Sequence, residues 1–97
     1  MDTAQKHADY MALYGMSHSG YNGSSIGDRI IQSGYNYSSC GENIAEGYIT
    51  VESVFDGWMR SPGHKRNILN TNYKDVGYGI ASSNNRVYWC VVFARPR

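Results

Sequence analysis

Residues 39–70, SCGENIAEGYITVESVFDGWMRSPGHKRNILN, constrain the fold more than any other stretch of the chain. Apolar residues recur there at helical spacing: Val51, Val54, Phe55, Trp58 and Met59. This spacing predicts one amphipathic helix. Thr50 is suited to cap its start, and Pro62 ends it, because a proline pushes the preceding residue out of the helical conformation. Glu42 and His64 flank this helix, which therefore sets their separation.

A second helix is predicted immediately after the first. Ser61 and Pro62 are suited to be its cap and its first residue, and it continues to Leu69. This places His64 in the first turn, with Ile68 and Leu69 on the buried side.

The N-terminal residues 2–14 also predict a helix, with Asp2 or Thr3 as its cap and Gly15 at its end. Its apolar stripe comprises Ala4, Ala8, Met11 and Ala12. His7 lies beside that stripe, so we expect it to be partly exposed and give it little functional weight.

Residues 16–25 read as a polar, glycine-rich loop that contains His18. A lone histidine in a loop is usually a solvated side chain, so the residue type alone says little about its role. A short helix is predicted over 25–33 and a loop over 35–40. The buried side of that helix is expected to comprise Ile26, Ile30 and Ile31.

The C-terminal half predicts a small sheet. Residues 41–46 form an extended run, and alternating apolar residues predict strands over 76–80 and 87–93, joined by a turn at 83–85. The last strand is apolar on both faces, so we expect it in the middle of the sheet. The fold class is therefore α/β (α+β): an α-β-α sandwich in which a small, mainly antiparallel sheet is covered by helices.

The size and charge of the chain exclude several classes of protein. Its 97 residues make a single domain, 1–97. The formal charge of +1 favours no nucleic-acid partner, and no apolar run approaches the ~20 residues of a transmembrane segment. No signal peptide is visible. Cys40 and Cys90 leave two alternatives open, a disulfide or two buried free thiols.

Six segments carry a resemblance to a known family, and they follow one another in the family's order. They are HADYMA at 7–12, MSHSGYNGSS at 16–25, GENIA at 41–45, WMRSPGH at 58–64, NILN at 67–70 and YKDVGYGIA at 73–81. The chain resembles the bacterial, SCP-like extracellular branch of the CAP superfamily, which includes cysteine-rich secretory proteins, antigen 5 and pathogenesis-related proteins. The resemblance implies the same sandwich and a secreted or cell-surface location. It also favours the Cys40–Cys90 disulfide, worth roughly 3–4 kcal/mol in the chain-entropy model.

One departure from the family is large. Family domains usually begin with another helix, carrying an Asn-x-x-Arg-like element, that has no counterpart here. We therefore expect an N-terminally truncated domain, either a fragment or a natural short form, with a bare apolar surface. We expect a second copy of the chain to cover that surface in a homodimer.

The resemblance also assigns a ligand cleft, residue by residue, to His18, Glu42 and His64. The second acidic position of many relatives is Ser61 here, and Glu52 lies too far back along the helix to replace it. Two neutral imidazoles, His18 and His64, can bind zinc or another divalent metal weakly, with water completing the shell. Glu42 would then fix a histidine tautomer or hold a bound water.

Three alternatives remain open at this site. Glu42 and Asn43 can serve only to hold backbone groups in place. The site can be that of a metal-dependent hydrolase, in which Glu42 activates a histidine-bound water and His18, Glu42 and His64 are the catalytic candidates. The domain can also bind lipid or sterol, as some relatives do.

Overall fold

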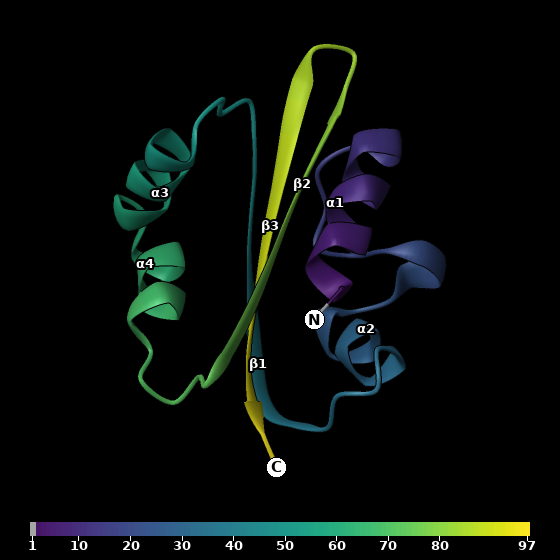
Figure 1. Ribbon diagram of the computed structural model, residues 1–97, viewed down its shortest axis with the longest axis vertical. Helices are drawn as coiled ribbons and strands as arrows, with labels where there is room; N and C mark the ends of the chain where they lie inside the picture. Colours follow the sequence, from purple (N-terminus) through teal and green to yellow (C-terminus); the bar gives the residue numbers. More distant parts are fainter. Residues whose placement is uncertain (1) are drawn as a thin grey trace.

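The computed structural model describes residues 2–97. Within this range the chain forms four α-helices, one 3-10 turn and three β-strands: α1 (Thr3–Tyr14), η1 (Tyr21–Gly23), α2 (Ile26–Gln32), β1 (Tyr37–Glu46), α3 (Val51–Met59), α4 (Pro62–Leu69), β2 (Asp75–Ser83) and β3 (Arg86–Pro96). Helices α1 and α2 lie on one side of the sheet and α3 and α4 on the other (Figure 1). β3 pairs with β1 and with β2, both antiparallel, so the α-β-α sandwich is confirmed.

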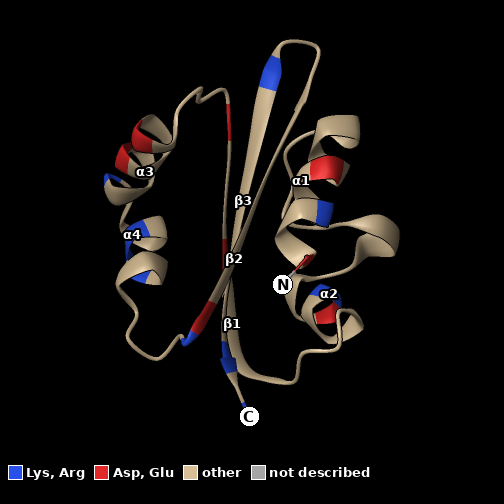
Figure 2. Ribbon diagram, viewed as in Figure 1, with Lys and Arg blue, Asp and Glu red and all other residues tan. Residues whose placement is uncertain are grey.

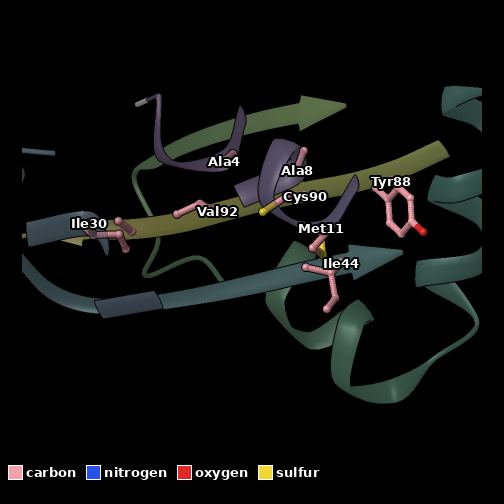
Figure 3. Packing of buried hydrophobic residues seen from close by; sticks show 9 residues of the cluster. Ala4, Ala8, Met11, Ile30, Ile44, Tyr88, Cys90 and Val92 are labelled. Atoms are coloured by element: carbon pink, nitrogen blue, oxygen red, sulfur yellow. The ribbon is translucent and has the colours of Figure 1, made fainter. Parts of the chain in front are cut away.

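β3 is the central strand, in the order β1-β3-β2, as its two apolar faces predicted. Successive side chains of a strand point to opposite faces, so β3 contributes to two core layers. Cys90 and Val92 pack with Ala8 and Met11 of α1 (Figure 3). Trp89 packs on the opposite side, in the layer that α3 covers.

Helix α3 begins where the sequence predicts, with the Thr50 side chain as its cap. Of its apolar stripe only Val54 and Trp58 are buried, because they alone reach the core layer around Ala45 and Trp89. The Trp58 indole N–H donates to the carbonyl oxygen of residue 44 at 3.1 Å. This bond fixes α3 against β1, the strand that carries Glu42.

The strands are longer than predicted. Residues 35–40 were expected to form a loop, but β1 begins at Tyr37 because this end of the strand pairs with β3 as far as Pro96. The predicted hairpin turn is confirmed. Asn84 and Asn85 have φ values of 53° and 65°, and asparagine tolerates this left-handed conformation better than most residues.

β2 presents different residues to its two sides. Gly77 and Gly79 are buried, and α1 packs closely on Gly79. The opposite face exposes an apolar strip, defined as Val76, Tyr78 and Ile80. At Ile80 the backbone N–H and carbonyl are bonded by the side-chain amide of Gln5, at 3.1 and 2.8 Å. That amide occupies backbone groups which a further strand would otherwise use.

The predicted disulfide is wrong, because Cys40 and Cys90 are free thiols at different levels of the sheet. Cys40 pairs with Ala94, whereas Cys90 pairs with Ile44, four positions further along β1. At about 3.3 Å per residue this separates the two cysteines by roughly 13 Å. A disulfide needs Cα atoms within about 7 Å, so the strand register itself prevents the bridge.

Candidate functional site

Glu42 lies at the centre of a buried polar cluster on the α1–α2 side of β1. Its side chain is 2% exposed. Its Oε1 lies 2.9 Å from His18 Nδ1, and its Oε2 accepts from Arg29 Nη1 at 2.8 Å. The thiol of Cys90 lies 3.5 Å from Oε2. A buried carboxylate is costly unless it is paired and hydrogen-bonded, and this one has partners on both oxygens.

Arg29 is the residue of this cluster that the sequence reading missed. It lies on α2, whose start is fixed by a capping box between Ser25 and Asp28. Besides binding Glu42, its Nη2 donates to the backbone carbonyl of His18 at 2.5 Å. One guanidinium therefore holds both the buried carboxylate and the loop that carries the histidine. The negative charge of Glu42 was the sequence signal that could have indicated Arg29, because a buried carboxylate needs a positively charged partner.

His18 combines a fixed nitrogen with an exposed ring. Its side chain is 61% exposed, although its Nδ1 is bound to a nearly inaccessible carboxylate. Because an ionised carboxylate only accepts hydrogen bonds, Nδ1 carries the proton and Nε2 of the neutral ring keeps its lone pair. This is the arrangement in which a carboxylate orients a metal-binding histidine.

His64 lies on α4, which covers the side of the sheet opposite α1 and α2 (Figure 1). Asn43, fully buried and next to Glu42, donates to the His64 carbonyl at 3.1 Å and accepts from Asn67 at 2.9 Å. Asn43 thus holds the backbone of His64 in place, which is the role that one of the three alternatives predicted for it. Burial, and then the charge of His18, lower the pKa of His64 below its ordinary value.

Ser61 lies at the predicted cap position of α4, whereas the burial of His7 was not predicted. Ser61 occupies the N-cap position of α4, but its side chain makes no capping hydrogen bond. His7 was expected to be partly exposed and is instead 1% exposed, so that prediction is wrong. The 15–20 loop folds over it, and its Nε2 lies 2.7 Å from the Ser17 carbonyl oxygen. Burial lowers the pKa of His7, which favours the neutral ring.

The stability of the fold is expected to fall as the pH drops below about 6.5. In the unfolded chain His7 and His64 bind protons near their ordinary pKa of about 6.5, whereas the folded state holds both pKa values lower. Their contribution to stability is therefore complete above about pH 7 and is lost as the pH falls through 6.5 towards the folded values. The slope from each histidine cannot exceed about 1.4 kcal/mol per pH unit.

Urea unfolding between about pH 5 and pH 8 measures this dependence. His7→Gln is the matched control, because a glutamine amide can still donate to the Ser17 carbonyl but does not titrate. The slope should be smaller in His7→Gln than in the parent. A parent protein equally stable at both ends of this range, or an unchanged slope in the variant, would contradict the buried neutral state of His7.

The described residues contain no closed, multi-ligand metal site. In the described part of the chain, residues 2–97, no three or more histidine, cysteine or acidic side chains gather as a ready-made metal site. His18 Nε2 and the His64 imidazole are the candidate ligands. Both oxygens of Glu42 already have partners, so its fitting role is to orient His18. The cleft of His18, Glu42, Ser61 and His64 stays a prediction.

Comparison with known proteins is consistent across sequence and structure. Residues 1–93 match the family model described as "Cysteine-rich secretory protein family", CAP. An extracellular protein containing an SCP domain from Bacillus anthracis superposes with a TM-score of 0.82 at 27% identity, over 97% of this chain and 30% of that one. An outer surface protein from Borrelia burgdorferi also gives 0.82 at 24% identity, over 100% of this chain and 76% of that one; at this identity the likeness concerns the fold alone.

A shorter match adds a sequence relative. The uncharacterized protein YkwD of Bacillus subtilis is 45% identical over 42 residues, which is 43% of this chain and 16% of that protein. The chain thus spans less than a third of both Bacillus proteins.

Proposed function

The chain belongs to the cysteine-rich secretory protein (CAP) family, and from this we propose that it is an extracellular or cell-surface module with a weak, exchangeable divalent-metal site at His18 and His64. The observation that carries the proposal is the 2.9 Å contact between His18 Nδ1 and Glu42 Oε1. It leaves Nε2 of an exposed ring as a ready ligand. A bound zinc ion would act there as a Lewis acid, or as a bridge to a ligand or partner.

The location rests on the relatives. The Bacillus anthracis and Borrelia burgdorferi proteins are an extracellular and an outer surface protein. Over residues 2–97, none of the helices has the length and apolar character needed to cross a membrane.

Isothermal calorimetry with zinc tests the metal site. We expect the parent protein to bind one ion per chain, and His18→Ala and His64→Ala each to weaken binding at least about tenfold. Binding should weaken as the pH falls, because protonated imidazole cannot coordinate a metal. Glu42→Gln should weaken it by about tenfold or more, the usual effect of removing a residue that orients a ligand.

The chain provides its own matched control. His7 is the third histidine of the sequence and is buried against Ser17. His7→Gln should therefore bind zinc like the parent. Equal zinc binding by the parent and both site variants, or none by the parent, would refute the proposal.

The surroundings of Glu42 favour an orienting role over catalysis. The metal-dependent hydrolase alternative needs Glu42 to take a proton from water. Its carboxylate is 2% exposed and is bonded to Arg29 and His18, which leaves it poorly placed for that step. A turnover lost in Glu42→Gln would nevertheless favour the hydrolase.

The homodimer remains a proposal supported by the exposed strip of Val76, Tyr78 and Ile80. The side chain of Tyr78 is 78% exposed in the middle of this strip. If a second copy covers the strip, sedimentation equilibrium should show dimers that Tyr78→Asp disrupts. A parent that stays monomeric at high concentration would exclude this contact.

A further inference from the structure

A cavity of about 530 Å³ lies between α1, η1 and α2, and its lining includes none of His18, Glu42, Ser61 and His64. It is therefore distinct from the metal site proposed above. Its size falls within the range of small-molecule sites, roughly 300–1,000 Å³. Its character can be deduced from the charges, the hydrogen-bonding groups and the aromatic rings in its wall.

The wall contains charged residues of both signs. Lys6 and Arg29 are positive, and Asp9 and Asp28 are negative. Figure 2 shows both signs on α1 and on α2. The lowered pKa of His7 keeps that ring neutral near physiological pH. Because the charge of Arg29 is already paired with Glu42, the wall has no excess of positive charge, which disfavours an anionic ligand.

Two buried nitrogens of the wall residues lack hydrogen-bond partners. Among residues 2–97 these are His7 Nδ1 and Arg29 Nε. Because His7 Nε2 faces the Ser17 carbonyl oxygen, it must be the protonated nitrogen, so Nδ1 is an acceptor. Arg29 Nε is a donor. Buried polar groups normally have partners, and a hydroxyl group can serve both kinds, directly or through one water.

Aromatic rings complete the wall. Tyr10 and Tyr21 meet edge to face, with centroids 4.7 Å apart and planes at 77°. Tyr21 is 57% exposed, which places part of its ring at the rim of the cavity. An aromatic face offers an apolar surface to the C–H groups of a ligand, while the neighbouring polar groups bind its hydroxyls.

We propose that this cavity binds a neutral, hydroxyl-rich ring, namely a single saccharide unit, with Tyr10 and Tyr21 as its apolar contact and His7 and Arg29 as hydrogen-bonding partners. Such a ring supplies hydroxyls that donate and accept, and its C–H faces suit the tyrosine rings. A lipid chain lacks the set of hydroxyls, and phosphate lacks the C–H faces.

Arg29 also connects this cavity to the His18 loop. Its Nη1 and Nη2 bind Glu42 and the His18 carbonyl, and the same residue lines the cavity. A bound saccharide should therefore also shift the backbone amide signals of the 15–20 loop. This effect does not require metal, so it can be measured on metal-free protein.

Amide NMR spectra of the ¹⁵N-labelled chain titrated with N-acetylglucosamine test the proposal. We expect saturable shifts for Tyr10, Tyr21 and their neighbours, with a dissociation constant of about 1–10 mM. Tyr21→Ala should raise that constant about fivefold or more, and Tyr21→Phe, which keeps the ring, should not. Tyr48→Ala removes a partly exposed tyrosine that does not line the cavity and should leave binding unchanged.

Parallel titrations with sodium phosphate and with decanoate distinguish other ligand chemistries. Saturable shifts of the cavity residues by either compound, without shifts by the saccharide, would overturn the proposal. So would equal saccharide binding by the parent and Tyr21→Ala. If Tyr21→Ala does not fold, Tyr21→Leu replaces it, because leucine keeps an apolar side chain without a ring. Failure here leaves the zinc result unaffected, because that test depends on other residues.

Discussion

Gly79→Ala is expected to destabilise the fold by about 3 kcal/mol or more, or to prevent folding altogether. A Cβ atom at this position of β2 would overlap Gln5 Cα and would lie 2.6 Å from Gln5 N and 2.7 Å from the Ala4 carbonyl oxygen. All three are backbone atoms of α1, so no side chain can rotate away. The whole helix would have to move outward, separating Ala4 and Ala8 from the core they share with β3.

Urea unfolding of Gly79→Ala and of Gly63→Ala measures this effect against a matched control. Gly63 lies in α4, and a Cβ atom there would meet nothing within 4 Å. Since alanine is a better helix former than glycine, Gly63→Ala should be neutral or stabilising by roughly 0.5–1 kcal/mol. Similar stabilities for the two variants would mean that α1 does not pack on Gly79 as described.

Local patterns predicted the elements well because capping and periodicity are local properties. Thr50 and Pro62 delimit the central helix, and alternation identified β3 as the middle strand. The buried faces were predicted less well. Ile31 and Leu69 were assigned to buried sides but are 58% and 57% exposed. Helical spacing tells which residues share a face, whereas the width of the covered face depends on the neighbouring layer.

At the candidate site, too, local motifs were informative, whereas contacts between segments far apart in the chain were not predicted. The resemblance assigned His18, Glu42 and His64 to a ligand cleft, but it pointed neither to Arg29 nor to the burial of His7. Both depend on how the 15–20 loop folds across α1 and α2, through the His18 and Ser17 carbonyl oxygens. Every residue has a backbone carbonyl oxygen, so the sequence does not indicate which of these oxygens accepts a side-chain hydrogen bond. Strand register likewise separates Cys40 from Cys90 and so prevents the disulfide.

Glu42→Ala should cost about 3–5 kcal/mol of folding stability, the usual effect of breaking a buried ion pair. The Arg29 side chain is only 11% exposed, so removing the carboxylate would leave its guanidinium buried without a counter-charge. Replacing both residues, in Glu42→Ala/Arg29→Met, removes this unpaired charge. The double variant should therefore lose less stability than the sum of the single variants, by about 1–3 kcal/mol.

The exposed pair Glu46–Arg86 provides a control in the same sheet. Its oxygen and nitrogen lie 3.2 Å apart, but the two side chains are 37% and 63% exposed. Solvent screens such pairs, so Glu46→Ala should cost about 0.5 kcal/mol or less. The two pairs have similar contact distances, so a large difference between Glu42→Ala and Glu46→Ala would reflect the burial of Glu42 and its additional contact with His18. If both changes cost the same, Glu42 does not organise the loop and His18, and the basis for a pre-oriented metal ligand is lost.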